Sequence, residues 1–262
     1  MSFTQASQSS IQTQFERDGF YHAKGVYSPD EVATLEHAFD RIVAQLMAGD
    51  ENINARWSGP EMDKMGAQNT VIYHTHQVHE FSHDWLQAIQ HKGFLDITEQ
   101  IIGPDIIMHH TKLFQKPAEK GAPFPMHQDY SYFASYKDTM MAGVIFVSDA
   151  TDEMGCLRVY PGSHKLGRVP GSSGNVESLM LTDYPIEKAT PVEVKAGDVV
   201  FFHYFTVHGS LPNRSNRVRK SVLVQMHAGD DEIEEGNRHP NSRLVVRGWN
   251  HTMTRSKAGL LH

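Results

Sequence analysis

The sequence predicts a mainly β protein with flanking helices, in which an N-terminal helical layer packs on a C-terminal jelly roll. Two observations support this prediction. Apolar residues recur at helical spacing in the first hundred residues, and after Gly103-Pro104 the chain changes to short apolar runs separated by Gly, Pro and Asp turns. We expect one domain over residues 1–262, with a mostly helical layer and entrance loops over 1–102 and the jelly-roll core over 103–262.

Two long helices and one short helix are predicted in the N-terminal part. Ser28 can cap a helix, Pro29 suits its first position, and Glu31 follows the cap by three residues. Apolar residues then recur on one face at Val32, Leu35, Phe39, Ile42 and Leu46. A second helical pattern runs from Trp85 to Ile102. A short helix and a strand are expected before Ser28, and a long loop rich in Gly, Asn and charge over 49–65.

The C-terminal part contains five runs with the composition of strands. Their density favours a sandwich or barrel over alternating βαβ units. The polar interval 167–191 is expected to be an insertion loop, of a length typical of functional lids. The five runs are IIMHHTKLF, MMAGVIFVS, CLRVYPGSH, PVEVKAGDVVFFH and RVRKSVLVQMH.

Composition narrows the class of protein. The chain has 39% apolar residues, and no stretch approaches the run of about 20 apolar residues that a membrane span needs. The N-terminus lacks the features of a signal peptide. A net charge of -7 argues against nucleic-acid binding, and a single cysteine, Cys156, excludes a disulfide framework. We expect a cytoplasmic globular protein. Its 17 histidines prompt a search for metal ligands.

His127-Gln128-Asp129 is the candidate metal-binding segment. In an extended chain His127 and Asp129 point to the same face. A third ligand must come from elsewhere, and His208 is the best candidate because Gly209-Ser210 and Arg219 follow it. Two His and one carboxylate leave three positions of an iron open, enough for 2-oxoglutarate and dioxygen, whereas a structural zinc site has four protein ligands. We therefore predict an Fe(II) site at these three residues.

The cosubstrate 2-oxoglutarate needs a cation for its distal carboxylate. Arg219 lies eleven residues after His208, and a turn through 211–213 would return its strand beside His208. Ser210 could add a hydroxyl to the same carboxylate. The alternative is that Arg217, Arg219 and Lys220 are a solvated charge cluster at a strand start.

These residues resemble the phytanoyl-CoA dioxygenase-like oxygenases. The resemblance implies a double-stranded β-helix, iron on His127, Asp129 and His208, and 2-oxoglutarate bound to Arg219. It also implies that Ser210, Gln128 and Lys112 lie near the cosubstrate. Matching pieces, in the family's order, are FERDGF, KLFQKP, PMHQDYSYF, DEMGCLRVYPGSHKLG, GDVVFFHYFTVHGSLPNRS and Arg219.

The resemblance also bears on the type of reaction. Related halogenases replace the carboxylate ligand with a small residue, so Asp129 favours hydroxylation. One departure is Gly143, where several relatives carry a bulky aromatic residue, and this suggests a differently bounded cosubstrate pocket.

Other histidines offer competing interpretations. His79-Glu80-Phe81-Ser82-His83 matches the H-E-x-x-H pattern of zinc metallopeptidases, with Glu99 as a possible third ligand. No long apolar helix precedes the match, so a polar helix start or loop is the better interpretation. His74 and His76 could line an entrance or lie on a surface strand. One of His109 and His110 must face inwards in the predicted strand, and His164 is expected to stabilise a turn.

The substrate prediction rests on tyrosines and arginines. They suit a small anionic or zwitterionic molecule, although each could be a core or surface residue. The pieces HQDYSYF and YPIEKA are similar to bacterial members that hydroxylate 2-aminoethylphosphonate-like compounds; another metabolite or an acyl substrate is the alternative. The sequence leaves the oligomeric state open. Candidate substrate residues are Asn69, Tyr73, Tyr130, Tyr132, Tyr136, Arg158, Arg243 and Arg247.

Overall fold

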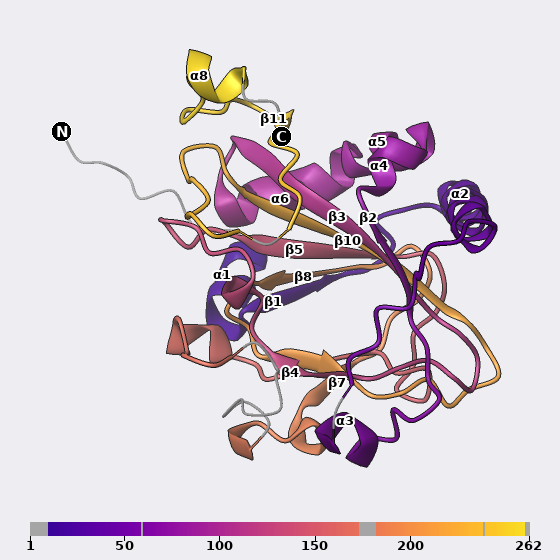
Figure 1. Cartoon of the computed structure of the whole chain (residues 1–262). Coiled ribbons are helices and arrows are strands. Elements are labelled where there is room, and N and C mark those ends of the chain that lie inside the picture. Colours follow the sequence, from indigo (N-terminus) through magenta and orange to yellow (C-terminus); the bar gives the residue numbers. More distant parts are fainter. Residues whose placement is uncertain (1–9, 59, 173–181, 238, 260–262) are drawn as a thin grey trace.

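A computed structural model describes residues 10–58, 60–172, 182–237 and 239–259. Two antiparallel sheets form its centre, with α2, α5 and α6 against the larger sheet and the smaller sheet on the other side (Figure 1). The larger, seven-stranded sheet has the order β1-β8-β5-β10-β3-β11, with β2 also paired to β3, and the smaller has the order β4-β9-β6-β7. This is the predicted mainly β jelly-roll architecture.

The strands of the larger sheet are β1 (Phe20–Ala23), β2 (Tyr73–His76), β3 (Ile106–Lys116), β5 (Met141–Phe146), β8 (Val199–His203), β10 (Arg219–Ala228) and β11 (Leu244–Arg247). Those of the smaller sheet are β4 (Phe124–His127), β6 (Leu157–Val159), β7 (Thr190–Val192) and β9 (His208–Ser210). Two of these strands, β1 and β2, come from the N-terminal part. Residues 1–102 therefore contribute to the larger sheet as well as to the helical layer.

The α-helices are α1 (Ser10–Asp18), α2 (Pro29–Met47), α3 (Pro60–Lys64), α4 (Val78–Phe81), α5 (His83–Ile89), α6 (Lys92–Ile102) and α8 (Arg255–Ala258). Short 3-10 turns are η1 (Asp129–Ser131), η2 (Ser163–Leu166) and η3 (Ile186–Lys188). The predicted capping box starts α2, since Ser28 and Glu31 bond each other's backbone N–H groups. The single helix predicted from Trp85 to Ile102 is wrong: the chain leaves helical geometry at His91 and forms α5 and α6.

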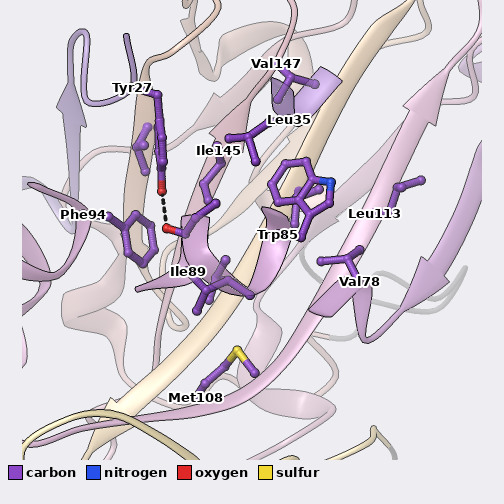
Figure 2. Close-up of a cluster of buried hydrophobic side chains, with 14 of the residues drawn as sticks. Tyr27, Leu35, Val78, Trp85, Ile89, Phe94, Met108, Leu113, Ile145 and Val147 are labelled. Carbon is purple, nitrogen blue, oxygen red and sulfur yellow. Dashed lines mark hydrogen bonds between the residues drawn. The ribbon is translucent and has the colours of Figure 1, made fainter. Parts of the chain in front are cut away.

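Strand alternation divides the apolar residues into two cores. On β5, Met141 and Ile145 face the helices, whereas Ala142 and Val144 face the smaller sheet. Figure 2 shows part of the first core, where Trp85, Ile89 and Phe94 lie among Met108, Leu113 and Ile145. The buried Tyr27 hydroxyl donates a hydrogen bond of 2.8 Å to the Ala88 carbonyl there. The second core fills the space between the sheets.

Two predicted loops also contain structure. The loop expected over 49–65 includes α3. The insertion loop expected over 167–191 is described only at its two ends, because residues 173–181 lie outside the described residues. Among the helices that the structure describes, none is long and apolar enough to cross a membrane.

Candidate metal centre and adjoining cavity

The structure brings the three predicted metal ligands together. β4 pairs with β9 so that His127 and His208 are direct cross-strand partners. Gln128 continues the extended chain before Asp129 opens η1, which keeps His127 and Asp129 on one side. Nε2 of His127 lies 3.4 Å, and Nε2 of His208 3.8 Å, from Oδ1 of Asp129. Within the described ranges, this is the one group of three His, Cys, Asp or Glu side chains close enough to share a metal ion.

Hydrogen bonds orient both imidazoles for metal binding. Nδ1 of His127 lies 2.8 Å from the Pro125 carbonyl, and Nδ1 of His208 lies 2.9 Å from the Thr206 carbonyl. A carbonyl only accepts, so each Nδ1 carries the hydrogen and each Nε2 directs its lone pair at the shared site. Burial lowers the pKa of His208 to about 4, which keeps it neutral at physiological pH.

Asp129 is held as a carboxylate with one free oxygen. Its Oδ2 accepts a hydrogen bond of 3.0 Å from Nε2 of Gln225, leaving Oδ1 towards the histidines. Burial alone would raise the pKa of Asp129, but His208, His127 and Lys112 lower it overall. Two imidazoles and one ionised carboxylate fit the donor set of a non-haem Fe(II) centre with open positions. Sequence reasoning missed Gln225, although its even spacing from Arg219 along one strand could have indicated it.

A cavity of about 240 Å³ adjoins the three ligands between the sheets. Its walls combine aromatic and aliphatic side chains with a few polar groups, which is typical of a small-molecule site. The polar groups other than the ligands are Lys112, Ser210, Arg219, Ser221, Tyr132, His74, His76 and His239. Trp57 and His239 were not predicted, because both lie in loops without a recognisable pattern.

Arg219 lies at one end of this cavity. It is 6% exposed, and its guanidinium carbon lies 5.9 Å from the centre of the Phe146 ring. One Nη donates to the Gly155 carbonyl, while Nε has no hydrogen-bond partner among the described residues. Burial lowers its pKa to about 10. Arg217 precedes β10 and its side chain is 55% exposed, so only Arg219 is placed to hold a ligand in the cavity.

A second buried cation, Lys116, lies beside Arg219. The two residues are cross-strand partners on β3 and β10. Nζ of Lys116 donates to Oγ of Ser210 at 2.6 Å and to the Leu211 carbonyl at 2.8 Å. Burial, with a smaller contribution from Arg219, lowers the pKa of Lys116 well below its usual value. Neither cation forms an ion pair with a residue that the structure describes, so this end of the cavity is suited to an anion.

Two predicted residues near the ligands have other contacts. Gln128 does not line the cavity; its amide donates to the carbonyls of Gly167 and Phe205 and accepts from the N–H of Val169. The Tyr130 hydroxyl donates to the Val169 carbonyl. Both side chains therefore anchor the start of the 167–191 interval. Gln128, which the resemblance places near the cosubstrate, therefore does not line the cavity, and its side chain is used in backbone contacts.

Other predicted substrate residues also lie outside the cavity wall. The Arg158 guanidinium pairs with Asp152 at 2.7 Å. Asn69 is exposed with φ 58°, a turn conformation that Asn tolerates. Tyr73 packs against the helix-side core, because strand alternation directs only its neighbours His74 and His76 into the cavity. Of the candidate substrate residues, Tyr132 lines it.

The remaining candidates are outside it as well. Tyr136 is 65% exposed. Arg243 donates to the Lys257 carbonyl, so it is used in a backbone contact near the C-terminal end of the described chain.

Gly143 is also not a boundary of the cosubstrate pocket. A Cβ at this position would lie 2.7 Å from the Phe94 ring, on the helix side of the sheet. The neighbouring Val144 lines the cavity instead. The expectation that Gly143 changes the boundary of the cosubstrate pocket is therefore wrong, because the next residue along the strand lines the cavity. The absence of a side chain at Gly143 instead leaves space for the Phe94 ring of α6.

The H-E-x-x-H segment does not form a metal site. The chain is extended at Ser82, with φ -143° and ψ 127°, so His79 ends up on α4 and His83 on α5. The two imidazoles therefore do not share a face of one continuous helix. Glu99 pairs with Arg247 at 2.6 Å. The metallopeptidase interpretation is not supported by this geometry.

The paired histidines in β3 are both buried against Phe133. A β-bulge opposite Gln225 and Met226 places the rings of both His109 and His110 against Phe133, with centroids 5.5 and 5.1 Å away. The sequence left open which of the two faces the core, and the structure buries both. His164 lies in η2, and its Nε2 lies 3.1 Å from the Glu16 carbonyl in α1, so its contact joins two distant elements rather than the turn that it was expected to stabilise.

Comparisons with known proteins agree with the geometry. Residues 15–221 match the phytanoyl-CoA dioxygenase (PhyH) family. A probable phytanoyl-CoA dioxygenase of Caenorhabditis elegans is 30% identical over 59% of this chain and 54% of the relative, so the match spans about half of that protein. L-proline trans-4-hydroxylase of Streptomyces griseoviridis is 27% identical over 77% of this chain and 84% of its own.

Solved structures share the fold. The epimerase SnoN, solved with Fe3+, alpha ketoglutarate and nogalamycin RO, superposes with a TM-score of 0.70. The alignment covers 90% of this chain and 94% of that one at 20% identity. The jelly-roll prediction is thereby confirmed.

Proposed function

This chain belongs to the phytanoyl-CoA dioxygenase family, and on that premise we propose that it is a non-haem Fe(II)- and 2-oxoglutarate-dependent dioxygenase. The reaction is hydroxylation of a small polar substrate by dioxygen, coupled to conversion of 2-oxoglutarate to succinate and CO2. One observation carries the proposal: a His-Asp-His group and a buried guanidinium without a carboxylate partner among the described residues share one small cavity.

Each end of the cavity has a distinct role in this proposal. His127, Asp129 and His208 would hold Fe(II), which supplies the binding of the 2-oxo acid group and the activation of dioxygen. Arg219 would bind the distal carboxylate of 2-oxoglutarate, with Ser210 donating a hydroxyl hydrogen bond. Lys116 donates a hydrogen bond to the hydroxyl oxygen of that serine. The apolar side chains between these groups exclude water from the reacting atoms.

Hydroxylation is favoured over halogenation by the carboxylate. Asp129 is 6% exposed and is fixed by Gln225, so it is built in as a ligand and leaves no additional position for a halide.

The proposed substrate is a small anionic or zwitterionic molecule such as a 2-aminoethylphosphonate-like compound. The cavity of about 240 Å³ suits a metabolite better than a long acyl chain. Lys112 and three histidines of its wall suit an acidic group. L-proline, the substrate in the name of one relative, is a zwitterion of comparable size.

The test is succinate formation by protein reconstituted anaerobically with Fe(II). A panel of small anionic and zwitterionic compounds should contain at least one that stimulates succinate release and gains one oxygen atom. Alanine at His127, Asp129 or His208 should each lower iron content and turnover. Near-native turnover in all three variants would rule the assignment out, and zinc as the activating metal would revive the peptidase alternative.

A further inference from the structure

One part of the cavity wall carries basic side chains that bind neither the metal nor the cosubstrate in the function proposed above. Strand pairing sets His76 on β2 beside Lys112 on β3. His239, from the loop before β11, lies with Nδ1 3.1 Å from Nε2 of His76. All three residues line the cavity, and we refer to them as the basic wall (His76, Lys112 and His239).

Lys112 is the charged member of the basic wall. Its Nζ lies 5.5 Å from the centre of the Phe133 ring. It has no hydrogen bond or ion pair with any residue in the described part of the chain. Burial lowers its pKa to about 8, while the charge of Asp129 acts in the opposite direction. An ammonium group enclosed in this way is stabilised by a bound anion.

The two imidazoles contribute hydrogen bonds rather than charge. Burial lowers the pKa of His76 to about 4 and that of His239 to about 3, so both are neutral near pH 7. The hydrogen bond between them uses one N–H. Each neutral imidazole carries one N–H, so one of the two remains free to donate into the cavity.

The basic wall lies one strand away from the residues assigned to the cosubstrate. Lys112 pairs across to Leu223 on β10, the strand that carries Arg219 and Ser221. Asp129 affects the pKa of both Lys112 and His239, so the wall is within electrostatic reach of the metal centre. A substrate held there would lie in the same cavity as the three residues that would hold the metal.

The charges of the loaded cavity leave room for one more anion. Among the side chains that line the cavity, Arg219 and Lys112 carry one positive charge each and Asp129 one negative charge; Fe(II) would add two positive charges and doubly charged 2-oxoglutarate two negative ones. Lys116 does not line the cavity and donates to Ser210 and the Leu211 carbonyl, so it is left out of this count. Asp129 is the one acidic side chain among the described residues that line the cavity. One positive charge therefore remains, at Lys112.

We propose that the basic wall is the subsite for the anionic group of the substrate, a compact oxoanion whose charge Lys112 neutralises and whose oxygen accepts the free N–H of the His76–His239 pair. A carboxylate and a phosphonate share this chemistry. The inference rests on the function proposed above and specifies where that substrate is held.

The test measures anion binding by full-length protein loaded with Ni(II) and saturated with 2-oxoglutarate, so that the metal and Arg219 are occupied. Methylphosphonate and acetate are titrated separately by calorimetry. At least one should bind saturably, and the tighter of the two identifies the acidic group. Lys112→Met, which keeps length and removes charge, should weaken that binding by at least about tenfold. Lys137→Met is the matched control, because Lys137 is 53% exposed and pairs with Asp230 outside the cavity.

Several results would overturn the subsite. The first is that the unmodified protein binds neither anion. The second is that Lys112→Met binds the anion as tightly as the unmodified protein does. The third is that Lys112→Met and Lys137→Met lose the same amount of anion affinity. A fall in 2-oxoglutarate affinity in Lys112→Met, with anion binding retained, would place this lysine at the cosubstrate instead. If Lys112→Met does not fold, His239→Phe carries the test and should weaken anion binding severalfold. Failure of the proposed function would differ, because succinate formation would be absent while Lys112-dependent anion binding persisted.

Discussion

Lys116→Met should separate cosubstrate binding from stability. Lys116 is fully buried, and its Nζ donates to Oγ of Ser210 at 2.6 Å. That bond occupies a lone pair of the serine oxygen, so the Ser210 hydrogen is directed elsewhere and can meet the distal carboxylate of 2-oxoglutarate. Methionine has a similar length but neither donates nor carries charge. Losing one charge-assisted hydrogen bond of about 1.5–3 kcal/mol should raise the Kd of 2-oxoglutarate about tenfold to hundredfold.

The same substitution should leave the fold intact. A buried ammonium beside Arg219 is desolvated, and an apolar residue of similar volume at such a site is often neutral or stabilising. The Tm of metal-free protein should therefore be unchanged or higher. Calorimetry of 2-oxoglutarate binding to Mn(II)-loaded protein gives the Kd, with the exposed Lys195→Met as the control. An unchanged Kd, or a large fall in Tm, would refute the role assigned to Lys116.

Four further outcomes follow from the structure. Arg219→Ala should raise the apparent KM for 2-oxoglutarate by one to several orders of magnitude while iron still binds. Arg217→Ala should behave as wild type in the same assay. If Arg217→Ala raised this KM and Arg219→Ala did not, the cosubstrate anchor would be Arg217. Glu80→Gln should change turnover little, so abolished turnover with iron still bound would give Glu80 a direct role. Gly143→Ala should lower stability by about 1–3 kcal/mol in chemical denaturation, because its Cβ would overlap a ring of α6; equal stability would show that α6 moves freely. Asp231 accepts five hydrogen bonds, which lower its pKa although burial alone would raise it. Asp231→Asn should therefore lower the free energy of unfolding at neutral pH, and the difference in that free energy between variant and wild type should shrink as the pH falls below about 4. A difference that stays constant down to about pH 2 would contradict this linkage.

The parts of the site that the sequence predicted correctly depend on strand geometry. His127 and Asp129 share a face because one extended residue separates them, and Arg219 enters the cavity at the start of a long regular strand. The capping box of α2 is likewise a local property of residues 28–31. In each of these cases, neighbours in sequence determine the direction of the side chain.

The sequence was less informative where tertiary contacts or irregular backbone decide that direction. Gln128 turns to the carbonyls of a distant loop, which no local pattern reveals. The bulge in β3 brings both His109 and His110 to the same side, against the rule of alternation. His239 reaches the cavity from a loop, and its role depends on the partner it finds on β2, His76.

In the proposed function, the spacing of two side chains on β10 limits which dicarboxylates the protein can use. Arg219 and Gln225 lie on the same strand, six residues and about 20 Å apart at the usual rise; Arg219 is the proposed anchor of the cosubstrate carboxylate, and Gln225 fixes Asp129. The segment of β10 between them fixes the distance between the two side chains. A single inserted residue would shift its far end by about 3.3 Å and reverse the face of every later side chain. The strand does carry an irregularity, but it falls between Gln225 and Met226, just beyond the measured span. In the proposed function, an unbroken piece of backbone therefore sets the spacing between the anchor of the distal carboxylate and the residue that fixes Asp129, and homologous diacids that are one methylene shorter should bind to one end only.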